Sequence, residues 1–442
     1  MSSGCCDNGN HVHIPQEIID LFVMGVDDLP RSARRKALAS CTLVSRSFGV
    51  LARRLLHATI TLSANRSSHP RTQSQLQRAF SLQIERLKEL VSQNADFAHL
   101  VRHLRLEGGA SRPNILTVMS EEVASVIDIL RLHARNLDSL ELVSISGRPF
   151  YCRDAPQNLL RSLMDMLTGV RLRCLHLEHI ILFPQLYILR CQTIKTLDLR
   201  FSSVDLSGTD DIPSHIPLPI IDRLVESIRL TELIITNVVN ASSMNFELFH
   251  LRRMHAKFVT PREAAIVGEL VEKASSSLVT LELWFHTQNY KIFEDNPIDI
   301  GKLSKIQQLR LVVETGLLAG TFPQLNDVLS LIDRPTQPTA LRSIDIILQC
   351  CSAAPEKLQI CPECPSDEAW RLLTLSNLRS KHPQLTRAYI NIDVDFASYL
   401  IVSKDERKEI VERLSKQLDA LIRTEDIPVF LEIEVTTRTS FA

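Results

Sequence analysis

The stretch LDSLEL at residues 137–142 places leucine at its first, fourth and sixth positions, with polar residues between. The same spacing of aliphatic residues returns at VRHLRL (101–106), LRCLHL (172–177), IKTLDL (194–199), LTELII (230–235), LVTLEL (278–283), IQQLRL (306–311) and LRSIDI (341–346). Weaker copies begin at residues 251 and 385, and alternating apolar residues run from 429 to 435. Because side chains alternate along a strand, each copy predicts a strand with its last two aliphatic residues inside and the residues between them outside.

The segments between these strands have helical patterns. Apolar residues recur at helical spacing over 76–91 and 121–132, the latter with Ser120 as its expected N-cap. Thr260 with Glu263, and Ser403 with Glu406, have the spacing of capping boxes, which predicts two further helix starts. Strands that alternate with helices in a repeated pattern predict an α/β solenoid of leucine-rich-repeat-like type, with parallel strands on the concave face and helices outside.

Two features of the repeat are irregular. Its copies start 21 to 44 residues apart, whereas leucine-rich repeats usually measure about 20–29 residues. The asparagine expected just after the strand is replaced by Gly109, Ile145, Ile180 and Ser202. We therefore expect an uneven curve without a regular asparagine ladder. The alternative is an ordinary doubly wound α/β domain.

Residues 12–62 have a different pattern, that of three short helices. Ile14, Ile18, Leu21 and Phe22 have the spacing of one apolar helical face, and further apolar helices are predicted near 37–44 and 48–56. A unit of this size buries little surface alone. The sequence therefore predicts a division into a disordered tail (1–11), a helical domain (12–62) and a solenoid (63–442).

The motifs of the helical domain resemble an F-box of the divergent form common in fungal proteins. They are IPQEII (14–19), LASCTLVSRSF (38–48) and LARRLL (51–56), with Ile-Pro for the usual Leu-Pro and Phe for the usual Trp. The resemblance implies a non-catalytic substrate receptor that binds a Skp-type adaptor and, through it, a cullin–RING ubiquitin ligase. The adaptor-facing positions that it implies are Ile14, Pro15, Ile18, Ile19, Cys41, Val44 and Phe48. Alternatively, these residues pack only the core of the unit itself.

The outward positions of the predicted strands are the expected binding surface for an unknown target protein. They mix both charges, which favours a protein partner over a polyanion. Trp284 is the most informative, since tryptophan is enriched in binding hot spots, although a loop at 286–297 is an alternative cover for its ring. The expected target-binding residues are Arg105, His176, Asp198, Arg200, Glu282, Trp284, Arg310, Arg387 and Tyr389.

The overall charge balance argues against other partner classes. Fifty basic and 51 acidic residues give a net charge of −1, so bulk electrostatic binding of nucleic acid is not expected. Between residues 29 and 57, however, seven basic residues occur without an acidic one, which indicates an ordinary solvated face, steering toward an acidic adaptor face, or a contact with nucleic acid. The apolar run at 180–189 is too short to span a membrane and residues 1–10 lack an apolar core, so we expect an intracellular protein, cytoplasmic or nuclear.

The sequence has one candidate metal cluster, Cys350 and Cys351 with Cys361 and Cys364. Two cysteine pairs suit tetrahedral zinc, although adjacent strand residues point to opposite faces, and a redox pair or plain loop cysteines are the alternatives. Motifs for phosphate-binding loops and zinc proteases do not occur in the sequence. We therefore expect no cofactor and no catalytic residue. Besides the ligase receptor, a binding scaffold outside any ligase and a metalloprotein remain open.

Overall fold

The structure is a computed structural model of the 442-residue chain. It describes residues 16–27, 29, 31–63, 72–108, 114–144, 149–205, 229–237, 248–287, 298–315, 331–332, 335, 337–352, 378, 380–396, 403, 405–406, 408–409, 411–413, 415–416 and 430–439. The expected tail and residues 353–377, including Cys361 and Cys364, lie outside these ranges.

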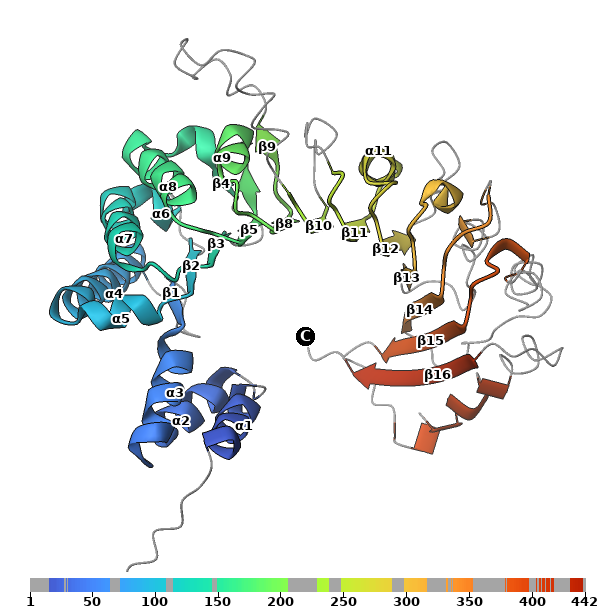
Figure 1. The fold of residues 1–442 in the computed structure, drawn as a ribbon, viewed down its shortest axis with the longest axis horizontal. Helices are drawn as coiled ribbons and strands as arrows, with labels where there is room; N and C mark the ends of the chain where they lie inside the picture. The colour runs from blue at the N-terminus through green and yellow to red at the C-terminus, as the bar shows by residue number, and fades with distance from the viewer. Residues whose placement is uncertain are drawn as a thin grey trace, which may run out of the picture.

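The main feature is a 12-stranded parallel sheet whose strand order follows the chain: β1-β2-β3-β5-β8-β10-β11-β12-β13-β14-β15-β16. Its strands form the inner, concave side of a broad arc (Figure 1). Because the order of the described strands follows the chain without reversing, they form no switch point, and the doubly wound alternative is wrong. The strands are β1 Thr59–Ser63, β2 His103–Glu107, β3 Ser139–Val143, β5 Cys174–Glu178, β8 Thr196–Arg200, β10 Glu232–Thr236, β11 Arg253–Phe258, β12 Thr280–Thr287, β13 Gln308–Thr315, β14 Ser343–Ser352, β15 Arg387–Phe396 and β16 Phe430–Thr439.

The repeated aliphatic residues meet in register across the sheet, as the alternation predicts. At the fourth position of the motif they lie side by side and are 0–3% exposed. The weaker copies at 251 and 385 form strands as well, with Met254 and Ala388 at that position. The row consists of Leu104, Leu140, Leu175, Leu197, Leu233, Met254, Leu281, Leu309, Ile344 and Ala388.

Helices cover the convex side of the sheet and close the core from outside (Figure 1). They are α4 Gln73–Gln93, α5 Ala95–Leu100, α6 Ile115–Val118, α7 Ser120–His133, α8 Gln157–Gly169, α9 Gln185–Arg190 and α11 Pro261–Lys273, with 3-10 turns η1 Cys152–Asp154 and η4 Ile300–Lys302. Both predicted capping boxes form: Thr260 Oγ1 accepts from Glu263 N at 3.3 Å, and Ser403 Oγ accepts from Glu406 N at 3.2 Å. Ser120 is not an N-cap, because α7 follows α6 so closely that Met119 occupies that place.

Two short strand pairs lie outside the main sheet. β4 Phe150–Tyr151 pairs with β6 Ile180–Ile181, and β7 Phe183–Pro184 pairs with β9 Val204–Asp205. Ser202 joins neighbouring repeats beside them: its Oγ accepts from Ile180 N at 3.0 Å and lies 3.0 Å from the Leu177 carbonyl oxygen. A serine therefore makes between-repeat hydrogen bonds at a position where an asparagine was expected.

The residues that directly follow β5, β8 and β10 have left-handed backbone conformations. His179, Phe201 and Asn237 have φ angles of 54°, 49° and 47°, which non-glycine residues seldom adopt. The rings of His179 and Phe201 stack with centroids 4.7 Å apart. The turn geometry thus repeats over three neighbouring strands even though their residue types differ.

Three helices precede the sheet: α1 Gln16–Asp27, α2 Arg31–Cys41 and α3 Arg46–His57. They pack around a small core of their own, at the end of the arc where the chain starts (Figure 1). Ser45 caps α3 by accepting a hydrogen bond from Phe48 N. β1, at Thr59–Ser63, already pairs with β2, so the sheet begins inside the range assigned to the helical domain.

Candidate binding surfaces

Most of the predicted target-binding residues lie in one row across the concave face. Parallel pairing places Arg105 opposite Glu141, Glu141 opposite His176, and His176 opposite Asp198. On the later strands the same row continues through Ile234, His255, Glu282, Arg310, Asp345 and Tyr389. Arg200 and Trp284 belong to the adjacent row, with Lys257 between them, and Arg387 lies one row to the other side.

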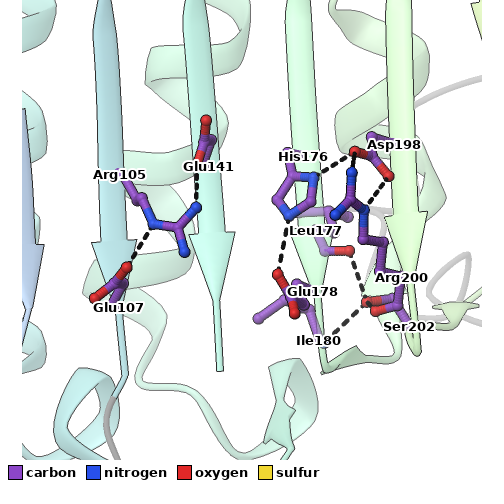
Figure 2. A network of polar contacts seen from close by, with 10 residues as sticks. All are labelled: Arg105, Glu107, Glu141, His176, Leu177, Glu178, Ile180, Asp198, Arg200 and Ser202. Atoms are coloured by element: carbon purple, nitrogen blue, oxygen red, sulfur yellow. Dashed lines mark hydrogen bonds and ion pairs between the residues drawn. The ribbon is translucent and has the colours of Figure 1, made fainter. Parts of the chain in front are cut away.

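Arg105 is held on this face by two carboxylates. Its Nε bonds to Glu107 on the same strand, and its Nη1 donates to Glu141 Oε2 on the next strand at 2.7 Å (Figure 2). Both ion pairs raise the pKa of the Arg105 guanidinium, although partial burial opposes them. The side chain is therefore already engaged within the sheet before any target binds.

His176 and Asp198 form a buried polar contact on the concave face. His176 Nδ1 lies 2.7 Å from Asp198 Oδ2, and its Nε2 lies 3.3 Å from Glu178 Oε2 (Figure 2). Arg200 donates to both Asp198 oxygens, at 3.1 and 2.9 Å. His176 and Asp198 are only 7% and 6% exposed. Both are outward, but their neighbours cover them, while Arg200 remains exposed, so the role of His176 and Asp198 as target contacts stays a prediction.

The pair shifts the pKa values of both groups. Burial opposes protonation of His176, but the hydrogen bonds and charges of Asp198 and Glu178 outweigh it, so the pKa of the imidazole is raised from its ordinary value of 6.5. Burial would also raise the pKa of Asp198, yet the hydrogen bonds from His176 and Arg200 lower it. The geometry thus favours an imidazolium between two carboxylates.

A thiol lies beside this network without the features of a nucleophile. Cys174 precedes His176 by two residues on β5, so both are on the same face. Burial raises the pKa of the Cys174 thiol, whereas an activated cysteine has a lowered pKa. Both nitrogens of His176 already contact carboxylates. The cluster therefore suits packing and charge organisation rather than covalent catalysis.

Trp284 is held by polar neighbours on both adjacent strands. Lys257 Nζ lies 4.2 Å from the ring centroid, and Trp284 Nε1 donates to Glu314 Oε2 at 3.3 Å. Lys257 Nζ also donates to Glu314 Oε2, at 3.1 Å. The ring is half-buried; the first two residues of the loop proposed as its alternative cover belong to β12, and residues 288–297 lie outside the described residues. Glu314 was not predicted, because the repeated motif spans only six residues, whereas β13 continues to Thr315.

The remaining predicted target residues form pairs along the later strands. His255 Nδ1 lies 3.0 Å from Glu282 Oε2, and this hydrogen bond lowers the pKa of the Glu282 carboxyl against the effect of burial. Arg310 Nε lies 3.9 Å from Glu282 Oε1, and the Arg387 guanidinium lies 5.7 Å from the Tyr389 ring centroid. Arg310 and Arg387 are exposed. They and Arg200 are the predicted residues most open to a partner.

The helical unit exposes apolar side chains on α1 and around the α2–α3 turn. Ile18 and Val44 are 54% and 64% exposed. Phe48 is half-buried and packs edge-to-face with Phe22, whose ring centroid lies 5.9 Å away. The other exposed apolar residues here are Leu21, Phe22, Met24, Leu43 and Val50. Together these residues form what we call the apolar helical surface.

Two predicted adaptor contacts pack in the unit's own core in the unbound chain. Ile19 and Cys41 are 6% and 5% exposed and pack with Val23, Leu38 and Ala52. Their burial favours the alternative of internal packing for these two, and their role as adaptor contacts stays a prediction. Ile14 and Pro15 lie outside the described residues.

Neither a metal cluster nor a membrane span occurs in the part of the chain that the structure describes. No group of three or more His, Cys, Asp or Glu side chains is placed to hold a metal ion there. Cys350 and Cys351 lie on β14, but their side chains and their proposed partners are not described, so the zinc hypothesis stays open. Among the described helices, none is long and apolar enough to cross a bilayer.

Comparison with known proteins gives matches among solved structures only. No family model matches the sequence, and no curated protein matches it. Among solved structures, the chain is similar to an internalin from Listeria monocytogenes, with 10% sequence identity, a TM-score of 0.25, and coverage of 81% of this chain and 89% of that one. A TM-score this low adds nothing to the argument, so the solenoid assignment rests on the strand order and the repeated motif themselves.

Proposed function

We propose that the protein is a non-catalytic substrate receptor of a Skp–cullin–F-box-type ubiquitin ligase. The helical unit would bind the Skp-type adaptor, and the concave sheet would bind the target protein. The receptor contributes proximity and orientation, while the chemistry belongs to other subunits. The proposal combines the F-box-like motifs of residues 14–56 with the solenoid that follows them.

The observation that carries the proposal is the apolar helical surface. A soluble helix normally turns its apolar stripe toward its own core, but α1 presents Ile18, Leu21 and Phe22 to solvent. An amphipathic helical surface laid against an apolar groove is a common mode of recognition. Exposed large apolar side chains that gather on one small unit often mark an interaction site. This surface supports contact with a partner, and the motif resemblance points to a Skp-type adaptor as that partner.

The test is co-purification of the full chain with a Skp-type adaptor. Wild-type protein should retain the adaptor through size-exclusion chromatography. Ile18→Asp combined with Val44→Asp should abolish the complex, because two charges would be buried unpaired against an apolar partner. Both side chains are more than half exposed, so the double variant should keep its fold, as circular dichroism would verify.

Leu132→Asp is the matched control. Leu132 is 62% exposed on α7, far from the helical unit in sequence, and the change introduces the same charge on an exposed apolar side chain. It should leave adaptor binding intact. The proposal fails if wild-type protein does not bind the adaptor at high concentration, or if the double variant binds it as well as wild type does.

The second candidate is a protein-binding scaffold outside any ligase. It is favoured by the concave face alone, where exposed Arg200, Arg310 and Arg387 lie among mixed charges. It predicts that pull-down of the full chain, analysed by mass spectrometry, recovers a partner that depends on these arginines but no adaptor or cullin. Recovery of adaptor and partner together would instead support the ligase receptor.

A further inference from the structure

We propose that the cleft between the helical unit and the first strands of the sheet binds an acidic linear segment of the target protein, one that also carries aliphatic side chains. We call it the junction cleft. It is lined by α2, the end of α3, β1, α4 and α5, and it reaches the concave face at Arg105. The proposal rests on the proposed function in assigning this segment to the target.

The junction cleft has the size of a ligand site. Its volume is about 620 Å³, within the range of about 300–1,000 Å³ typical of binding pockets. It lies where two separately packed cores meet, at the end strand of the sheet. Clefts between packed units are a common place for binding sites. A segment bound there would contact the helical unit and the solenoid together.

Charge complementarity points to an acidic occupant. Among the described residues, the lining contains four arginines, at positions 34, 35, 86 and 105, and one carboxylate, Glu141. Glu141 is already paired with Arg105, which also pairs with Glu107, so Arg105 adds no net positive charge to the cleft. Arg35 and Arg86 are exposed and form no ion pair with another described residue. The cleft therefore presents a net positive field to whatever enters it.

A titratable group in the wall is affected by this field. Burial lowers the pKa of His57, and the positive charges of Arg35 and Arg53 lower it further. His57 is the last residue of α3, and this helix belongs to the stretch of residues 29–57 that has seven basic residues and no acidic one. Two arginines, Arg35 in the wall and Arg53 beside it, thus act on the same imidazole.

Apolar residues between the arginines favour a peptide over a nucleic acid. Leu29 and Leu90 are 42% and 48% exposed at the cleft, and Leu55 and Leu56 are half-buried in its wall. Single-stranded nucleic acids are usually held by aromatic platforms beside basic groups. Phe97 is the one aromatic ring among the described lining residues other than His57, with which it packs at 5.2 Å. Aliphatic patches beside guanidinium groups instead fit a segment that alternates carboxylates with leucine-like side chains.

The test uses the full chain and a short fluorescein-labelled peptide with the repeat Glu-Glu-Leu, measured by fluorescence polarisation. We expect saturable binding that weakens as salt is raised. The isosteric Gln-Gln-Leu peptide should bind at least about tenfold more weakly, because it lacks the charges that the arginines complement. Arg35→Glu with Arg86→Glu should weaken binding of the acidic peptide by a similar factor, and Arg35→Gln with Arg86→Gln by less.

Lys36→Glu with Arg78→Glu is the matched control. These residues are exposed on α2 and α4, the same helices as Arg35 and Arg86, but do not line the junction cleft. The control should bind the acidic peptide like wild type. The proposal is overturned if both peptides bind equally, if the control loses as much affinity as the cleft variant, or if a single-stranded oligonucleotide binds more tightly than the acidic peptide.

The adaptor experiment separates this proposal from the proposed function. The cleft variant should still co-purify with the Skp-type adaptor, because Arg35 and Arg86 lie outside the apolar helical surface. Loss of peptide binding with retained adaptor binding supports the junction cleft. If the cleft variant binds the peptide as well as wild type does, the junction cleft is not the binding site. That result would leave the adaptor proposal unaffected.

Discussion

The helical unit and the sheet differ in how far they bury their apolar side chains. In the sheet, aliphatic side chains from β1 to β15 face one continuous core, and charged side chains occupy the concave surface. Among the described residues of the helical unit, the buried hydrophobic core consists of Ile19, Val23, Leu38, Cys41 and Ala52, while more apolar side chains lie on its surface. The sheet thus buries its apolar side chains within itself, whereas the helical unit leaves many of them exposed.

The difference follows from how each region buries surface. Stacked repeats share their cores with both neighbours, so each added unit buries its apolar face without a partner. Three short helices have too little interior for all of their apolar residues. The excess remains available for another protein.

The largest effect is expected from a truncation in the sheet core. Leu281 is fully buried on β12 between Met254 and Leu309, so Leu281→Ala should cost about 2–5 kcal/mol of unfolding free energy through lost burial and a cavity. Urea denaturation followed by far-ultraviolet circular dichroism measures it. Adaptor binding by the helical unit should not change, and a parallel loss of adaptor binding would show that the two cores are one cooperative unit.

The same substitution in the small core should act locally. Leu38 is 1% exposed in the helical unit, and Leu38→Ala should remove about 2–3 kcal/mol from that unit, toward the lower end of the range because a small core relaxes more easily. Hydrogen exchange should show lost protection in α1–α3 and unchanged protection in the sheet. Equal loss of protection in both regions would contradict the separation.

A smaller effect is expected at the buried ion pair of the concave face. Asp198→Asn should cost about 1–3 kcal/mol near pH 6, because it leaves His176 and Arg200 without their shared carboxylate. Asp138→Asn, at an exposed pair with Arg173, is the matched control and should cost little. Urea midpoints of the two variants give the comparison.

The pH dependence of the stability difference between wild type and Asp198→Asn follows from the directions of the two pKa shifts. The pKa of His176 is raised. The contribution of His176 to folding stability is therefore complete below the ordinary pKa of 6.5 and is lost as pH rises through the raised pKa. The pKa of Asp198 is lowered. The contribution of Asp198 to folding stability is therefore present above the ordinary pKa of 3.8 and is lost as pH falls through the lowered pKa. The stability gap between wild type and Asp198→Asn should therefore be widest between these ordinary values and narrow on both sides.

The sequence was sufficient to predict the sheet because its signal is local and repeated. Each copy places aliphatic residues at the same spacing, and the capping boxes at Thr260 and Ser403 depend on residues only three positions apart. β1 was missed because its residues, TITLS, contain a shorter pattern that directly follows a helix. The prediction of Ser120 as an N-cap was wrong because α6, the short helix before it, has only four residues and no clear periodicity.

The binding surfaces were less predictable because they depend on contacts between distant residues. Alternation correctly placed His176 and Asp198 on the concave face, but their mutual burial arises from side chains on neighbouring strands. Helical spacing suggested an apolar face on α1 without showing which part remains exposed. The junction cleft joins residues from Leu29 to Glu141, a juxtaposition with no local sequence signal.

The smallest effect is expected from two lysine–glutamate ion pairs that have the same N–O distance but differ in solvent exposure. Lys257–Glu314 and Lys302–Glu272 both have N–O distances of 3.1 Å, but the first pair is 28% exposed on each side chain, whereas the second is 59% and 68% exposed. Double-mutant cycles with Lys→Met and Glu→Gln should give a coupling of about 0.5–1 kcal/mol for the first pair, which also contacts the Trp284 ring. The second pair should give about 0.2–0.5 kcal/mol or less, since water screens it more strongly. Equal couplings would mean that the concave face screens its charges like open solvent, and that its ion pairs do not organise the surface that a target meets.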